Sequence, residues 1–424
     1  MKSCVNGNGI DRTNPAWLKL DLYCKGIRLS EGCLPKDTHG RPILRTRAGL
    51  GSGIELILPE NLWTNVPVTE EFAADSPYEL IHDQHGYFVH YEGERLVEVG
   101  IAPRPLWYDQ QSRSGKRMDR IGTLQGTYLA IYPAAVCEYW KESPRVNCRF
   151  CSVGLNLGYD DADDKTIEDI MDVVHAAREE TGITYVDFNT GHYTGETYLD
   201  ILEPMIRRIK AETDLFIGVQ TPPHHDLSRY DRLQAIGVNR VSFCFELFDQ
   251  DTFEKICPGK NREYGLQRYL DAVEYCAQLS RKGTWKNPWV ANGEIIVGLE
   301  PPEASIRAID WMTSIGAIPT VCVFRPLKAP IWRSSLLPIQ RICSLSLNAF
   351  TAPPWKEGCR SDWLQTSMSA WCSCRMNAGF SEIIRNALRV PKKSARSRRV
   401  FSLSSTSPAG SCVACSAEGT DGSC

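Results

Sequence analysis

The stretch from Thr127 to Gly154 reads TYLAIYPAAVCEYWKESPRVNCRFCSVG. Its first part, TYLAIYPAAVC, is a short apolar run of the kind that forms a buried strand. Three cysteines follow at the end of this run and just beyond it: Cys137, Cys148 and Cys151. Three thiols grouped directly after a strand indicate a site at the end of that strand.

Beyond the cysteines, apolar runs alternate with amphipathic segments as far as residue 328. The further expected strands are ITYVDFNTG, LFIGVQT, RVSFCFELFD, EIIVGLE and TVCVFRP. Between them lie five segments with helical spacing, such as KTIEDIMDVVHAAREE. Six strands alternating with five helices predict parallel βα units, which right-handed crossovers curl in one direction. We therefore predict an α/β fold, a partial (β/α)6 TIM-like barrel over residues 123–328, with its site at the carboxyl ends of the strands.

The region before the barrel has a different texture. Residues 1–122 contain short apolar runs broken by Gly and Pro (IELILP, LWTNVPV, YFVHYEG and RLVEVGIAP), which predict an N-terminal α+β domain. No stretch approaches the ~18 consecutive apolar residues of a membrane span, and the first residues lack the apolar core of a secretory signal. We therefore expect a cytoplasmic location. In that compartment the 17 cysteines indicate metal ligation or buried thiols, and most of the scattered ones are expected in the core.

The region after the barrel differs again. Residues 329–424 hold twelve basic and five acidic residues, so they carry +7, and residues 1–328 carry the remaining −10 of the net charge of −3. Amphipathic periodicity is weak there. A one-nucleotide shift just after the Lys328 codon can restore a proline-rich segment, so we predict that residues 329–424 are a frameshift product without packed structure. The alternative is a native tail with its own metal site built on Cys372, Cys374, Cys412 and Cys415.

The cysteine group allows several interpretations from its residues alone. Cys148 and Cys151 form a C-x-x-C, which by itself fits a zinc half-site, a redox pair or chance. A structural zinc site normally closes with four ligands, and no fourth cysteine or histidine is near this group in the sequence. Three thiolates on a [4Fe-4S] cluster leave one iron open for another ligand. The residues therefore favour an iron–sulfur cluster held by Cys137, Cys148 and Cys151.

This arrangement resembles the radical S-adenosylmethionine (radical SAM) superfamily, in which three cysteines after the first barrel strand hold a [4Fe-4S] cluster. S-adenosylmethionine chelates the open iron in that family. Its commonest spacing is C-x3-C-x-Φ-C, with an aromatic residue where this chain has Phe150. The first gap departs, because ten residues (EYWKESPRVN) separate Cys137 from Cys148. Elongator-type members have such stretched loops, and the N-terminal segments also resemble the radical SAM proteins of bacterial nitrilase gene clusters.

The resemblance implies further cofactor-binding residues at the strand ends. The segment NTGH after the second strand lies where a GGE-type segment of the family meets the methionyl amine, although the glutamate is missing. Acidic, adenosine-side and adenine-side positions follow on the fourth, fifth and sixth strands. For Glu246 the residues also allow a buried carboxylate paired with a lysine or arginine of the barrel. The residues implied to bind S-adenosylmethionine are Phe150, Thr190, Gly191, His192, Glu246, Gly298 and Arg325.

The function implied by the resemblance is reductive cleavage of S-adenosylmethionine to a 5′-deoxyadenosyl radical that acts on an unknown substrate. We expect a small-molecule substrate, an external one-electron donor such as flavodoxin or ferredoxin, and no membrane association. The charge of −10 over residues 1–328 leaves little surface for phosphate, which disfavours an elongator-type enzyme acting on tRNA. That enzyme and a zinc-stabilised barrel without a redox role are the alternatives.

Overall fold

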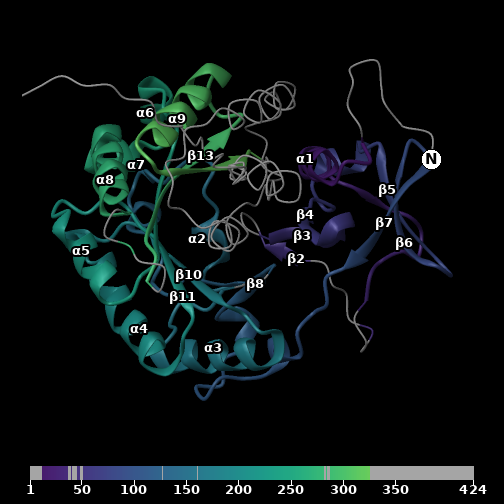
Figure 1. Cartoon of the computed structure of the whole chain (residues 1–424), viewed down its shortest axis with the longest axis horizontal. Coiled ribbons are helices and arrows are strands. Elements are labelled where there is room, and N and C mark those ends of the chain that lie inside the picture. The colour runs from purple at the N-terminus through teal and green to yellow at the C-terminus, as the bar shows by residue number, and fades with distance from the viewer. Residues whose placement is uncertain are drawn as a thin grey trace, which may run out of the picture. The chain divides into compact units, whose positions relative to one another are not determined.

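The computed structural model describes residues 12–36, 40, 45–47, 51–126, 128–159, 161–280, 283 and 287–324. These residues form two β-sheets, and helices line one side of the second, curved sheet (Figure 1). Arg325 and the predicted frameshifted tail, residues 329–424, lie outside the described residues.

The second sheet confirms the predicted α/β barrel. Its strands follow one another in space in the order β14-β13-β12-β11-β10-β9-β8. All neighbours from β9 to β14 pair in parallel, and β8, which the sequence did not predict, pairs antiparallel with β9. The strands are β8 (Thr123–Gln125), β9 (Tyr128–Ile131), β10 (Tyr185–Asn189), β11 (Phe216–Gln220), β12 (Arg240–Glu246), β13 (Val290–Val297) and β14 (Ile318–Val323).

The five predicted helices all form between these strands. The clearest start signal is at Thr166, whose hydroxyl accepts a hydrogen bond from the Asp169 amide while the Asp169 carboxylate accepts one from the Thr166 amide. The helix that begins there ends at Gly182 in the left-handed conformation, with φ of 61°. The helices are α2 (Val153–Asn156), α3 (Ile167–Thr181), α4 (Tyr198–Glu212), α5 (Ser228–Ala235), α6 (Gln250–Ile256), α7 (Pro258–Glu263), α8 (Gly265–Leu279) and α9 (Pro302–Ser314).

The first sheet belongs to the N-terminal part of the chain. Its strands run in the order β1-β5-β6-β7-β3-β2, and β4 pairs with β3. The four apolar runs quoted from the sequence fall on β3, β4, β6 and β7, while α1 and β5 were not predicted. The elements are α1 (Pro15–Lys25), β1 (Arg28–Leu29), β2 (Arg45–Arg47), β3 (Gly51–Leu58), β4 (Leu62–Val66), β5 (Tyr78–Asp83), β6 (Gly86–Tyr91) and β7 (Glu94–Ile101).

Short 3-10 turns complete the described structure, at Pro59–Asn61, Glu71–Asp75, Leu106–Asp109, Met118–Arg120, Glu138–Trp140 and Thr194–Glu196. Among the described helices, none has the length and the apolar composition that crossing a membrane requires.

A charged pair is buried inside the barrel sheet. Arg240, the first residue of β12, donates to Asp187 of β10 at 3.2 Å and to the Asn292 side chain of β13 at 2.9 Å. The Asp187 and Arg240 side chains are at most 2% exposed. The strand between them carries Gly218, where a Cβ would lie 1.6 Å from the Tyr185 hydroxyl and 2.4 Å from the Asp187 carboxylate. Glycine is therefore required at that position, because any side chain would displace the pair.

Candidate cofactor site

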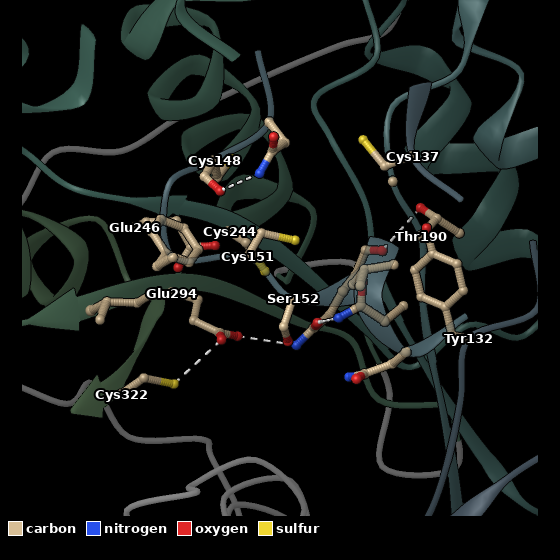
Figure 2. A pocket seen from close by; sticks show the side chains of 18 of the residues that line it. Tyr132, Cys137, Cys148, Cys151, Ser152, Thr190, Cys244, Glu246, Glu294 and Cys322 are labelled. Carbon is tan, nitrogen blue, oxygen red and sulfur yellow. Dashed lines mark hydrogen bonds between the residues drawn. The ribbon is translucent and has the colours of Figure 1, made fainter. Parts of the chain in front are cut away.

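A cavity of about 360 Å³ lies at the carboxyl ends of the barrel strands. Asn189, Gln220 and Glu246, which end β10, β11 and β12, all line it. Figure 2 shows the cysteines and the carboxylates Glu246 and Glu294 around this space. The sequence-predicted residues that the cavity brings together are Cys137, Cys148, Phe150, Cys151, Thr190, Gly191, His192 and Glu246.

Two of the predicted cofactor-binding residues are not brought into this set. Gly298 follows the last residue of β13, with φ of 98°, and it is absent from the cavity lining, whereas Glu294 and Ile296 of the same strand line it. Its predicted contact with the cofactor has no counterpart in the cavity wall. Arg325 lies outside the described residues.

The end of β10 fits closely against the first cysteine. The backbone amide of His192 donates to the Cys137 sulfur at 3.4 Å. A Cβ on Gly191 would lie 2.5 Å from the Cys137 Cβ, so any residue but glycine would push the cysteine away. Gly191, the one glycine that this chain shares with the family's GGE-type segment, is therefore needed to hold Cys137 in its position.

The spacing of the three sulfurs differs from that of a zinc site. Tetrahedral zinc with Zn–S bonds of about 2.3 Å places its sulfurs about 3.8 Å apart. The sulfurs of Cys137, Cys148 and Cys151 do not all lie within 4.8 Å of one another, since among the described residues only Glu196, His224 and His225 form such a group. The triad is thus more open than a closed zinc site and has room for a larger group.

The stretched loop between Cys137 and Cys148 is held in place by α7. The Gly259 amide donates to the Val146 carbonyl at 3.0 Å, and Arg262 donates two hydrogen bonds to Glu142 at 2.8 and 2.7 Å. A Cβ on Gly259 would lie 2.8 Å from the Tyr139 ring, so the loop packs directly on the helix backbone. The ten-residue gap therefore forms an ordered wall of the cavity.

His192 is anchored from two sides. Its Nδ1 lies 2.5 Å from the Tyr264 hydroxyl, and its ring stacks on Tyr139 with 4.4 Å between centroids. Burial lowers the pKa of His192, which favours the neutral imidazole. The side chain connects Tyr139 of the cysteine loop to Tyr264, the residue between α7 and α8, and its contact with S-adenosylmethionine stays a prediction.

Glu246 combines the two roles considered for it. Its Oε1 accepts from the Lys260 ammonium at 3.3 Å, and the same ammonium donates to the Cys244 carbonyl. Its Oε2 is buried and has no hydrogen-bond partner among the described residues. Burial raises the pKa of Glu246, while the Lys260 charge acts to lower it. The carboxylate is paired with a barrel lysine and still has one oxygen available for a ligand in the cavity.

Several cavity residues were missed by sequence reasoning. Glu294 of β13 accepts from Gln220 at 3.0 Å and from the Cys322 thiol at 3.4 Å. Burial, together with the charge of Glu246, raises the pKa of Glu294 to about 8. A charged residue inside the apolar run GEIIVG was the available signal. Cys322 and Cys244 also line the cavity, although the scattered cysteines were expected in the core.

A fourth thiol lies beside the triad. Cys257 is buried, and a hydrogen bond from it lowers the pKa of Cys148 against the opposing effect of burial. The sequence argument that no fourth thiol is near the group is therefore wrong in space, because the turn between α6 and α7 brings Cys257 back from 109 positions further along the chain. Burial raises the pKa of Cys151 to about 12 and also raises that of Cys137, so a bound metal must displace their protons.

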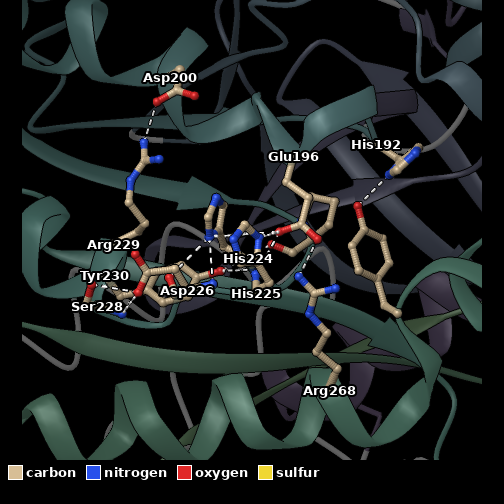
Figure 3. A network of polar contacts seen from close by, with 12 residues as sticks. His192, Glu196, Asp200, His224, His225, Asp226, Ser228, Arg229, Tyr230 and Arg268 are labelled. Carbon is tan, nitrogen blue, oxygen red and sulfur yellow. Dashed lines mark hydrogen bonds and ion pairs between the residues drawn. The ribbon is translucent and has the colours of Figure 1, made fainter.

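A polar network ties together the loops after β10 and β11, beside the cavity. Figure 3 shows Glu196 between the ring of His225 and the guanidinium of Arg268. The His225 Nδ1 lies 2.9 Å and the His224 Nδ1 3.9 Å from the Glu196 Oε2. Burial acts to raise the pKa of Glu196. The hydrogen bonds from Arg268 and His225 together outweigh burial, so the pKa is lowered overall. The carboxylate is ionised and holds both loops.

Comparison with known proteins identifies the domain. Residues 145–297 match the family profile of the Radical SAM superfamily. The matched segment begins after Cys137 and contains Cys148 and Cys151. The bacteriochlorophyllide c C-7(1)-hydroxylase of Chlorobaculum limnaeum is 26% identical over 129 residues, which are 30% of this chain and 31% of that protein. The chain thus matches about a third of the length of this curated relative.

Solved structures of low sequence identity were also found. Methylornithine synthase has 14% identity and a TM-score of 0.40, covering 58% of this chain and 69% of the other. The hydrogenase maturase of Carboxydothermus hydrogenoformans has 18% identity and a TM-score of 0.40, covering 58% and 57%. The profile match confirms the predicted radical SAM domain within residues 145–297.

Proposed function

We propose that Cys137, Cys148 and Cys151 hold a [4Fe-4S] cluster and that the cavity beside them binds S-adenosylmethionine. When bound, the cluster would supply the electron that cleaves the sulfonium reductively to a 5′-deoxyadenosyl radical, which then removes a hydrogen atom from a substrate. The observation that carries the proposal is the placement of three cysteines from one loop around a cavity that also contains a buried, half-unpartnered carboxylate.

The residues present fit these groups. Three thiols spaced more widely than a zinc site suit a cluster and leave one iron for an external ligand. The unpartnered Oε2 of Glu246 is an acceptor at a place where a ligand hydroxyl or ammonium would satisfy it. Lys260 supplies a buried cation in the same wall.

The chain's own residues have three tasks in this proposal. Gly191 and the His192 amide seat Cys137, while α7 fixes the loop that ends in Cys148. Glu246 and Lys260 orient the polar groups of the ligand. The cavity removes the reacting atoms from bulk water, which protects a radical from side reactions.

The test is anaerobic incubation of the iron-loaded protein with dithionite and S-adenosylmethionine, followed by chromatographic detection of 5′-deoxyadenosine. We expect product in wild type, and none in a protein that has lost a triad cysteine. An iron-loaded wild-type protein that leaves S-adenosylmethionine intact would contradict the proposal.

The partners belong to the same proposal. A small-molecule substrate is expected, since a cavity of about 360 Å³ excludes a macromolecule. A one-electron donor protein, such as a flavodoxin or ferredoxin, is needed to reduce the cluster. The net charge of −10 over residues 1–328 argues against a nucleic-acid substrate.

A zinc-stabilised barrel is the second candidate, and Cys257 is the observation that favours it, because four thiols can close a zinc site. The wide spacing of the triad argues against it. Metal analysis separates the two: bound iron and sulfide with visible absorption support the cluster, and a colourless protein with one zinc supports the alternative.

A further inference from the structure

In the cysteine loop, residues that line the cavity are direct neighbours of residues exposed to solvent. Trp140, Asn147 and Phe150 of this loop line the cavity. Lys141 and Arg149, their direct neighbours in the chain, are exposed to solvent. The stretched loop thus presents one set of side chains to the cofactor site and another to whatever meets the surface.

The solvent side of this loop is cationic. Arg145 is exposed like Lys141 and Arg149, and none of the three has an ion pair with any residue that the structure describes. Of the loop's two acids, Glu142 pairs with Arg262, whereas Glu138 accepts two hydrogen bonds from the neutral Thr194 at 2.6 Å and keeps its negative charge. Together with Arg262 the loop therefore carries a net charge of +2, on a chain whose first 328 residues sum to −10.

The loop also has an aromatic centre and an apolar neighbour. The Arg145 guanidinium lies 5.5 Å from the centre of the Trp140 ring, which packs on Gly154 so closely that a Cβ there would lie 2.3 Å away. Leu155, the next residue, is 62% exposed. An apolar contact bordered by charges is the usual composition of a small transient interface.

We propose that Lys141, Arg145, Arg149 and Leu155 form the docking surface for a small acidic protein that carries one electron. The inference rests on the proposed function, which requires such a carrier. Charge complementarity selects the partner: the negative charge of the remaining protein repels an acidic carrier, and the loop attracts it. Docking there brings the carrier against the loop that holds Cys137 and Cys148, which α7 fixes through Gly259 and Arg262.

The test compares protein-driven with chemical reduction. The variant K141E/R145E/R149E is loaded with iron and sulfide, and the oxidation of an acidic flavodoxin, reduced to its hydroquinone, is followed anaerobically by stopped flow. We expect the second-order rate constant to fall by roughly 10–100-fold at low salt and the difference to shrink as salt is raised. Formation of 5′-deoxyadenosine with dithionite should be unchanged, which separates a failed docking surface from a failed enzyme.

The control is R178E/R208E/R307E, which makes the same change of charge on the outer helices α3, α4 and α9; because Arg178 pairs with Asp214 and Arg208 with Glu212, its dithionite reaction is measured as well to show that it is folded. We expect it to retain most of the rate with flavodoxin. If the loop variant also loses the dithionite reaction, K141Q/R145Q/R149Q replaces it, and a flavodoxin rate reduced at unchanged dithionite activity supports the proposal. Equal flavodoxin rates in wild type and loop variant, or equal losses in loop variant and control, would overturn it.

Discussion

Each end of strand β12 has a buried charged side chain, and the two side chains differ in their partners. At the amino end, Arg240 pairs with Asp187 and also donates to Tyr185 and to Asn292. At the carboxyl end, Glu246 pairs with Lys260 through one oxygen, and its other oxygen has no partner among the described residues. The first arrangement connects three strands and reaches the cavity lining only through Asp187, whereas both members of the second line the cavity.

This difference separates a structural pair from a ligand-binding pair. Removing one partner from a fully buried pair leaves an uncompensated charge, so the pair at the amino end is expected to matter for folding. An unpartnered acceptor beside a cavity costs stability in the empty protein and is satisfied when a ligand arrives. We therefore expect the amino end to control stability and the carboxyl end to control chemistry.

The largest expected effect is at the cysteines of the carboxyl end. Cys148→Ala should reduce 5′-deoxyadenosine formation by at least about 10³-fold, because the cluster loses one of three ligands. Chromatography of the anaerobic reaction measures the product, and iron analysis measures the cluster. Cys276→Ala is the control, since that thiol is buried in α8 away from the cavity and should leave the iron content and the product unchanged.

Arg240→Met should destabilise the protein by about 3–5 kcal/mol, because Asp187 is left buried without its cation. Urea unfolding of the purified protein gives the change in the free energy of unfolding. A variant as stable as wild type would show that the pair at the amino end of β12 does not stabilise the sheet. It would contradict the role in folding assigned to that pair.

Glu246→Gln should have the opposite profile. We expect a loss in the free energy of unfolding of about 1–3 kcal/mol, smaller than that of Arg240→Met, because Lys260 loses its carboxylate partner but keeps its hydrogen bond to the Cys244 carbonyl. The dissociation constant for S-adenosylmethionine, measured by calorimetry, should rise by about 10-fold. A loss of stability as large as that of Arg240→Met, with unchanged binding, would reverse the assigned roles.

Glu294 gives the same end of the sheet a pH dependence. Its pKa is raised from 4.5 to about 8, so the unfolded chain ionises at a lower pH than the folded one. Its contribution is fully present below pH 4.5 and is lost as pH rises towards about 8. Glu294→Gln should therefore raise the thermal midpoint relative to wild type by a few °C at pH 8, and by less at pH 6. A difference that is constant across this range would exclude Glu294 as the source.

The smallest expected effect is at Cys257. If the triad alone holds the metal, Cys257→Ala should keep its iron and its 5′-deoxyadenosine formation, with a modest change in the rate because a hydrogen bond to Cys148 is lost. The zinc alternative predicts instead that this variant loses bound zinc. Elemental analysis of the variant beside wild type distinguishes the two outcomes.

The sequence predicted the barrel and the cysteines for a clear physical reason. Parallel strands buried on both faces read as continuous apolar runs, and helices between them keep a regular apolar stripe. Phe150 follows such a run in the sequence, and Thr190 lies near the end of another. Both residues line the cavity. Their position along the chain was enough to place them at the carboxyl end of the sheet.

What could not be predicted depends on side-chain direction and on long-range contacts. The side chains of Glu294 and Gln220 point into the cavity because alternate residues of a strand face opposite sides of the sheet. A shift of one residue would exchange the two sides without changing the apolar pattern, so the sequence did not show which residues face the cavity. Cys257 lies beside the triad because of the turn between the short helices α6 and α7. The position of Lys260 in α7 depends on the same turn. The resemblance placed Gly298 on the fifth strand at the adenosine side, but it lies one residue past β13 and is absent from the cavity wall.

The central claim is that the triad holds a cluster with one iron open to S-adenosylmethionine. Mössbauer spectroscopy of the protein loaded with ⁵⁷Fe, recorded without and with S-adenosylmethionine, tests it most directly. The account predicts a [4Fe-4S] spectrum in which about one iron in four changes its isomer shift when S-adenosylmethionine is added. A spectrum that S-adenosylmethionine leaves unaltered, or a protein that binds zinc and no iron, would contradict it.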